Sequence, residues 1–305
     1  KAAIGGLTAS LSLLFIVAVA LHNEMYRTRP APAQLTSFYL MMSVGGVIGG
    51  FFCAIVAPLL FDWTWEHPIL ILMAAALLPA IPLLQVNETD KRLPVIMAII
   101  GAIALALGLF GGISEPVESS FTKILLAATI ITLGIAVAGF RIPFLLAVAG
   151  LLTINGGWYS LQQSLDGVRM RSYFGTYTVN ASESGRVRWL NHGTTMHGMQ
   201  LLDDPTRPIS YYPDTSGVGI AMLNAPRLYG PKASIGIVGL GTGTLACYRR
   251  PGQSWQFFEI DPLVIEIARE RKIFSFLEKC APDVPITLGD ARLTLATVPE
   301  GKFDI

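Results

Sequence analysis

The chain has little charge for its length. Charged residues make up 14% of its 305 positions, whereas hydrophobic residues make up 52%. An average soluble domain carries about 25% charged residues. The formal net charge is only +1, so the excess of basic residues that marks a nucleic-acid-binding protein is missing. These proportions exclude an ordinary soluble domain and favour a protein that buries much of its surface in lipid.

Cysteine is also scarce. The three cysteines are Cys53, Cys247 and Cys280, and none of them forms a CxxC or a Cys/His pattern. Such patterns are the usual sequence signal for a metal centre or a disulfide framework. We therefore expect neither a metal nor a disulfide.

The few charges are distributed unevenly. Residues 1–160 hold seven Lys/Arg and seven Asp/Glu, and residues 161–305 hold fifteen and fourteen. We expect a multi-span transmembrane domain at 1–160, a small β-rich substrate-side domain at 161–230, and a truncated nucleoside-binding domain at 231–305.

Long apolar runs fill the first half and predict about six membrane-spanning helices, because about 20 apolar residues cross the hydrocarbon core. The last two runs form either a tight hairpin or one broken element. Within the second run, Gly45-Gly46-Val-Ile-Gly49-Gly50 predicts close helix packing, and a hinge is the alternative. The predicted runs are 2–21, 35–61, 69–84, 94–113, 124–140 and 142–154.

The second half changes pattern. Alternating residues from Val168 to Leu202 predict a small antiparallel sheet. Three apolar runs then alternate with helical patterns, at Ile235–Val238, Trp255–Phe258 and Pro285–Leu288. This order predicts a parallel, doubly wound α/β sheet of the Rossmann-like type. The glycine spacing described next favours the S-adenosylmethionine methyltransferase form of it.

A glycine-rich turn follows the first of these strands. Gly239, Gly241 and Gly243 occupy alternate positions, and glycine permits both a tight turn and close approach of a ligand to the backbone. The pattern lacks the GxGxxG spacing typical of dinucleotide sites. Gly-x-Gly-x-Gly is more typical of S-adenosyl ligands. We expect a helix to begin directly after the turn and to present free N–H groups and its positive dipole end.

Two carboxylates end the next two strands. Glu259 lies about twenty residues after the turn, where nucleotide-binding units hold ribose hydroxyls. Asp290 ends the third strand and would accept the adenine amino proton; the alternative is that it only caps the following helix. Ligands bind outside the carboxyl ends of such strands, so the three features together predict one nucleoside site.

Several segments together resemble the membrane-fused spermidine synthase-like family, which joins a multi-span segment to a polyamine aminopropyltransferase domain. The glycine motif and Glu259 are shared with all S-adenosyl methyltransferases, whereas the His-Gly-Thr-Thr and Tyr-Tyr segments are more specific. The resembling segments are Arg171-Ser-Tyr-Phe-Gly-Thr-Tyr177, Asn191-His-Gly-Thr-Thr-Met-His-Gly-Met-Gln200, Ser210-Tyr-Tyr212, Val238–Thr244, Phe258-Glu-Ile-Asp261 and Gly289-Asp-Ala-Arg292.

The resemblance implies that decarboxylated S-adenosylmethionine donates an aminopropyl group to a polyamine such as putrescine. It adds Asp261 to the donor site and places Tyr212, His197 and Gln200 on the substrate side. Pro213 replaces the histidine that follows the tyrosine in the soluble enzymes. The chain begins without a Met and stops at Ile305 in the middle of an apparent strand, so we interpret it as a fragment cut at both ends. The resemblance implies that the family's proton-accepting carboxylate would lie beyond Ile305.

Two alternatives stay open. One is an S-adenosylmethionine-dependent methyltransferase that uses the same pocket. The other is a polyamine transporter or sensor with a regulatory nucleoside-binding domain. A homodimer also stays open, and the lipid bilayer and a small amine are the expected partners, without nucleic acid.

Positive charges bear on orientation. If all six runs cross the membrane, counting favours by one charge a C-terminal domain outside the cell. An S-adenosyl donor is cytosolic, and we therefore expect a bacterial inner-membrane protein with its C-terminal domain in the cytoplasm. One side would carry Arg27, Arg29, Lys91, Arg92 and Arg141, and the other Lys1, Lys123, Arg169 and Arg171.

Overall fold

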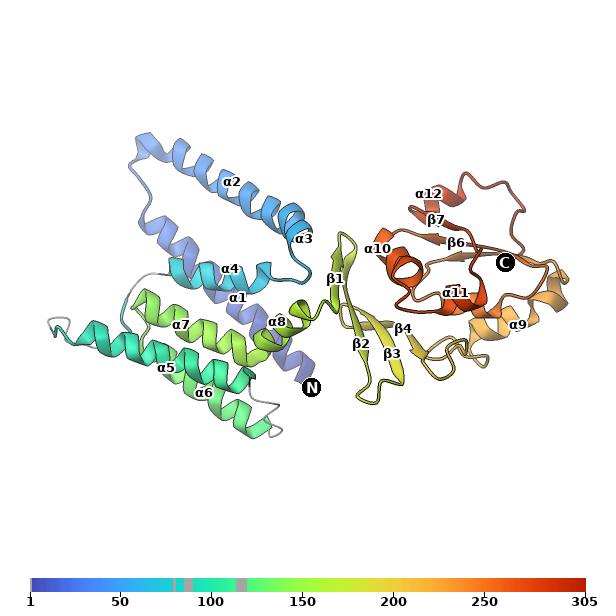
Figure 1. The fold of residues 1–305 in the computed structure, drawn as a ribbon. Helices are drawn as coiled ribbons and strands as arrows, with labels where there is room; N and C mark the ends of the chain where they lie inside the picture. Colours follow the sequence, from blue (N-terminus) through green and yellow to red (C-terminus); the bar gives the residue numbers. More distant parts are fainter. Residues whose placement is uncertain (1, 79–80, 85–89, 114–119) are drawn as a thin grey trace. The chain divides into compact units, whose positions relative to one another are not determined.

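The chain divides into two units, 1–166 and Gly167–Ile305, which we call unit 1 and unit 2. The computed structural model describes residues 2–78, 81–84, 90–113 and 120–305 (Figure 1). In its described part, unit 1 is helical, whereas unit 2 contains both sheets.

Unit 1 is a series of helices; a short 3₁₀ turn precedes α2, and α2 and α7 each pass into a short π turn. The elements are α1 (Ala2–Arg27), η1 (Pro32–Gln34), α2 (Leu35–Phe51), η2 (Phe52–Val56), α3 (Ala57–Leu60), α4 (Glu66–Leu77), α5 (Leu93–Ile113), α6 (Ser120–Ala136), α7 (Arg141–Leu152), η3 (Thr153–Gly157) and α8 (Trp158–Leu165).

By length and composition, three helical stretches of the described chain could cross a membrane: Pro32–Leu60, Leu93–Ile113 and Arg141–Leu165. This finding supports the prediction of a membrane unit. Of the six predicted spans, three coincide with a stretch that is long and apolar enough to cross. α4 and α6 are apolar but shorter than the ~20 residues that a span needs. α4 stops early because Leu78, with ψ 146°, is extended ahead of Pro79. The first side chains of α1 and residues 79–80 lie outside the described part.

The closest helix packing in unit 1 joins α5 to α7. A Cβ added at Gly101 would lie 2.6 Å from the Pro143 Cα, and one at Gly108 would overlap the Gly150 backbone. The predicted packing site is wrong: a Cβ at any of the four α2 glycines would meet nothing within 4 Å. Small residues allow close packing only where a second helix presents a matching face, and here that face is on α7.

Gly108→Ala is expected to destabilise unit 1 by about 1–3 kcal/mol, because the added methyl group overpacks the contact between α5 and α7. Gly45→Ala, in an open position on α2, is the matched control and should leave stability unchanged. The melting temperature of each variant is measured in detergent, as the temperature at which the monodisperse size-exclusion peak is lost. Equal melting of the two variants would contradict the packing described.

Of the two arrangements predicted for the last two apolar runs, the structure shows the tight hairpin. α6 and α7 pack against each other and are joined by a turn at Gly139, where φ is 98°. α7 continues into α8 through η3, where Asn155 and Gly156 leave helical geometry. The Asn155 amide donates to the Leu151 carbonyl at 2.7 Å, which satisfies one acceptor exposed near this break.

Unit 2 begins with the predicted antiparallel sheet, whose strand order is β1-β2-β3-β4. The register pairs Tyr177 with His192, and an irregularity at Leu190/Asn191 shifts the pairing of β3 with β4. The strands are β1 (Arg169–Ser172), β2 (Gly175–Ala181), β3 (Val187–His192) and β4 (Thr195–Leu201).

A parallel sheet follows α9 (Gly217–Tyr229), with the order β5-β6-β7. This confirms the predicted parallel strands. The end of the chain runs along the free edge of β5: Asp304 N donates to the Ser234 carbonyl, and Gly236 N to that of Ile305. The remaining elements are β5 (Ser234–Val238), η4 (Thr244–Tyr248), β6 (Ser254–Glu259), α10 (Pro262–Ile265), η5 (Glu266–Glu270), α11 (Phe276–Cys280), β7 (Ile286–Leu288) and α12 (Ala291–Leu295).

One hydrophobic cluster serves both sheets of unit 2. Tyr177 and Leu190 of the antiparallel sheet belong to it together with Ile235 and Phe257 of the parallel sheet. Segments 161–230 and 231–305, expected as separate domains, therefore share a core from Met170 onward.

Cys247 and Cys280 form a disulfide across 33 residues of sequence. The prediction that the cysteines stay unpaired is wrong because η4 and α11 pack together, which no local spacing reveals. Cys53 is free.

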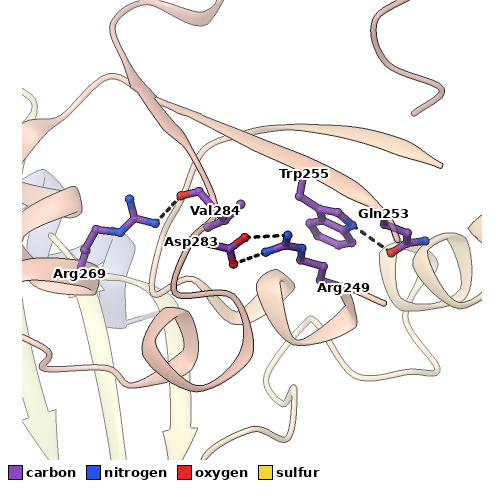
Figure 2. A network of polar contacts seen from close by, with 6 residues as sticks. All are labelled: Arg249, Gln253, Trp255, Arg269, Asp283 and Val284. Carbon is purple, nitrogen blue, oxygen red and sulfur yellow. Dashed lines mark hydrogen bonds and ion pairs between the residues drawn. The ribbon is translucent and has the colours of Figure 1, made fainter. Parts of the chain in front are cut away.

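The loop before β7 is held from two sides (Figure 2). Arg249 makes two bonds to the Asp283 carboxylate, at 2.6 and 3.0 Å, and Arg269 donates to the Val284 carbonyl. The Arg249 guanidinium lowers the pKa of Asp283. Nearby, the Trp255 indole donates to Gln253 at 3.0 Å. These contacts set where β7 begins, and hence where its carboxyl end lies.

Candidate functional site

The turn after β5 depends on its three glycines. Their φ angles are 89° at Gly239, 56° at Gly241 and 82° at Gly243, a region that residues with a Cβ rarely adopt. A Cβ at Gly239 would meet nothing within 4 Å, so this part of the turn is open. At Gly243 a Cβ would lie 2.8 Å from Leu277 Cγ, so close packing on α11 also requires glycine there.

The element after the turn differs from the prediction. η4 is a five-residue 3₁₀ helix over Thr244–Tyr248, not a full helix. Pro251 and Gly252 follow shortly and favour a turn over a continuing helix. A helix this short has no substantial macrodipole, so the prediction that a helix dipole contributes to ligand binding here is wrong.

Glu259 fastens the turn to the end of β6. The residue is 7% exposed. Its Oε2 accepts from Leu240 N at 2.8 Å and its Oε1 from Asp261 N at 3.0 Å. A carboxylate has about four acceptor positions, so both oxygens can accept again. The backbone thus fixes the carboxylate without using up its capacity.

The carboxyl ends of the three strands meet at one edge. The register places Val238 beside Phe258, and Glu259 beside Leu288. Asp290 follows directly after Gly289, whose φ is 141°. Asp290 caps α12, its Oδ1 accepting from Arg292 N at 2.8 Å. The alternative prediction, that Asp290 caps the following helix, is therefore correct for Oδ1.

Apolar side chains are exposed at the same edge. Val238 is 65% exposed, Leu288 53% and Ile260 43%. In the sequence, Val238 directly precedes the glycine turn and Ile260 directly follows Glu259. Leu288 lies two residues before Asp290. A flat apolar ring placed here would remove this surface from water, which is favourable in proportion to the area covered.

Asp261 is 1% exposed. Its Oδ1 accepts from Leu263 N at 2.9 Å and caps α10, and its Oδ2 accepts from Ser172 Oγ and Tyr177 Oη, at 2.5 and 2.8 Å. Burial and this carboxylate raise the pKa of Tyr177. The contacts of Asp261 therefore join the two sheets. Its partners Ser172 and Tyr177 lie in a segment that carries the resemblance, but the sequence assigned them no role in the site.

β4 passes beside the glycine turn. A Cβ at Gly198 would overlap the Thr242 side chain, and one at Gly241 would lie 3.3 Å from the His197 carbonyl. The Tyr177 ring stacks on His192, with centroids 4.6 Å apart, and the His192 and His197 centroids are 5.3 Å apart. The three rings form a column that extends from β2 across β3 to β4.

The two other predicted substrate-side residues have protein partners. Gln200 is 1% exposed; its Nε2 donates to the Pro205 carbonyl and Ser275 Oγ, and its Oε1 accepts from Ser275 N. The Tyr212 carbonyl accepts from Tyr248 Oη at 2.8 Å. The structure thus brings together the glycines, Glu259, Asp290 and His197, whereas the contacts of Gln200 are structural.

Comparison with protein-family models, curated proteins and solved structures found no match. In the described part of the chain, no group of three or more His, Cys, Asp or Glu residues is arranged to hold a metal ion.

Proposed function

We propose that the protein is a membrane-anchored transferase whose unit 2 binds an S-adenosyl compound. It moves an aminopropyl group from decarboxylated S-adenosylmethionine to a polyamine such as putrescine. The observation that carries the proposal is the Glu259 carboxylate, which two backbone N–H groups fix beside a turn of positive-φ glycines. Such a preorganised carboxylate suits the two neighbouring hydroxyls of a ribose.

The topology supports a Rossmann-like domain. With the chain end beside β5, the order is β7, β6, β5 and then residues 304–305. Doubly wound sheets share this 3-2-1-4 order and bind ligands outside the carboxyl ends of their strands, where the order reverses. Gly239 follows β5 at that reversal.

The rest of the nucleoside has partners at the same edge. Ile260 and Leu288 offer apolar surface to an adenine ring. The second carboxylate oxygen of Asp290 has no hydrogen bond in the described structure, and it would accept the adenine amino proton. The sulfonium end of the donor then extends along the open glycine turn toward β4.

Aminopropyl transfer at this site is a displacement. The lone pair of an amine attacks the donor carbon bonded to sulfur, the C–S bond breaks, and its electron pair stays on sulfur to give methylthioadenosine. The amine must first lose a proton, since an alkyl ammonium has a pKa near 10. The His-Gly-Thr-Thr and Tyr-Tyr segments favour this chemistry over methyl transfer, because they resemble polyamine aminopropyltransferases more specifically than the glycine motif does.

The full-length protein in detergent, mixed with putrescine and decarboxylated S-adenosylmethionine, is expected to release methylthioadenosine at a rate that depends on both substrates. Chromatography of the nucleoside products measures it, and omission of putrescine is the control. Tight binding of S-adenosylmethionine without methylthioadenosine would instead favour a methyltransferase, which forms S-adenosylhomocysteine from a suitable acceptor.

One observation favours the transporter or sensor hypothesis. Unit 1 contains a cavity of about 300 Å³ next to the break at η3, lined in part by Trp63, Trp65, His67 and Asn155. Non-helical backbone at membrane depth is tolerated where it lines a cavity, and transporters bind substrates at such breaks. Polyamine flux in proteoliposomes that survives Glu259→Ala would support this second function.

We place unit 2 on the cytoplasmic side of a bacterial inner membrane, since S-adenosyl donors are cytosolic. The one-charge excess argues for the other side, as does the Cys247–Cys280 bond, because cytosolic thiols are normally kept reduced. The redox state of this pair in cells therefore tests the orientation.

A further inference from the structure

His197 differs from the other polar side chains around the glycine turn. In the described structure its ring nitrogens have no hydrogen-bond partner, and its own carbonyl lies against Gly241. The ring is half-buried at the end of the column formed with His192 and Tyr177. It is thus an unpaired proton-binding group beside the open turn.

The neighbouring titratable groups already have partners. Both oxygens of Glu259 accept backbone N–H bonds, and those of Asp261 accept from Leu263 N, Ser172 and Tyr177. His192 Nε2 lies 3.2 Å from the Phe174 carbonyl. Since a carbonyl can only accept, this bond places the proton of a neutral His192 on Nε2.

We propose that His197, rather than the carboxylate that the family resemblance implies, is the proton acceptor for the attacking amine. This rests on the proposed transferase function and assigns a catalytic residue to it. The imidazole takes one proton from the substrate ammonium and becomes imidazolium. The freed amine lone pair then forms the N–C bond while the C–S electron pair leaves on sulfur, so charge and protons balance.

The surroundings keep His197 ready to accept. Burial lowers its pKa and so does the neighbouring His192, while the Glu259 carboxylate acts in the opposite direction. On the far side of His192, the Tyr177 ring stacks on the imidazole and its hydroxyl donates to Asp261. Above its pKa the imidazole is neutral and accepts a proton; below it the ring is charged and cannot. Turnover should therefore fall on the acid side.

The test compares His197→Gln with His192→Gln in the full-length protein. His197→Gln is expected to lower kcat about 100-fold, the scale of losing a general base. It should abolish the acid limb of the pH–kcat profile and leave the dissociation constant of methylthioadenosine within about twofold, since no nucleoside contact is lost. His192→Gln should keep the limb but move it to higher pH, because a neighbour that lowers the pKa of His197 is gone.

Retained kcat and an unchanged acid limb in His197→Gln would overturn the proposal while leaving the transferase function intact. Absence of methylthioadenosine binding by the wild-type protein would instead reject the proposed function itself. If His197→Gln does not fold, His197→Ala assayed with added imidazole decides. Recovery of kcat in proportion to neutral imidazole supports the proposal, and no recovery overturns it.

Discussion

Glu259→Gln is expected to weaken nucleoside binding by about 1–3 kcal/mol, or roughly 5- to 150-fold in dissociation constant. A glutamine has the same shape but a single acceptor oxygen and no charge. Its NH₂ group must face either Leu240 N or Asp261 N, which are both donors. The ribose hydroxyls lose a charged acceptor, and the glycine turn loses one of its two bonds to β6.

Calorimetry with methylthioadenosine measures the effect. Glu278→Gln is the matched control, because Glu278 pairs with Lys272 on the surface of the same unit; exposed ion pairs contribute little, and its affinity should equal that of the wild type. Thermal melting of each variant separates lost binding from a loosened turn. Wild-type affinity in Glu259→Gln would remove this carboxylate from the ribose site.

Local sequence signals predicted the frame of this site well. Residues with a Cβ rarely adopt the three positive φ angles after β5, so three alternating glycines are a strong local signal for the turn. The lengths of the apolar runs fixed the parallel strands, and strand order then brought Glu259 and Asp290 to the same edge. The turn and each strand depend on residues within a few positions of one another, and the alternation of strands and helical segments supplied the pairing.

Contacts between distant segments could not be predicted in this way. Asp261 lies two residues after Glu259, yet its partners Ser172 and Tyr177 lie more than eighty residues earlier. The same holds in unit 1. The glycines of α2 and those of α5 look alike in sequence, and only α5 has a partner helix.

The disulfide is the other feature that spacing concealed, and removing it should have the largest effect on stability. Replacing Cys247 and Cys280 with serine is expected to lower the free energy of unfolding of unit 2 by about 3–4 kcal/mol, the chain-entropy estimate for a loop of this size. The bond ties η4, directly after Gly243, to α11, whose Leu277 packs on that glycine. Nucleoside affinity should therefore fall as well.

Pulse proteolysis of the full chain in urea, following cleavage within unit 2, measures the change. Cys53→Ser removes the free cysteine of unit 1 and should not alter the midpoint. If the double serine variant and the oxidised wild type resist urea equally, the bond does not constrain unit 2 as described.

The same cysteines report on which side of the membrane unit 2 works. Cytosolic thiols are kept reduced, so the proposed orientation predicts that Cys53, Cys247 and Cys280 all react with a polyethylene-glycol maleimide when cells are lysed in denaturant without reductant. Labelling of Cys53 alone would show that the bond persists in cells and would favour the oxidising side. The donor is not supplied there, so the charge count and the disulfide would then outweigh the resemblance, and the transferase proposal would have to be abandoned in favour of a binding or transport role.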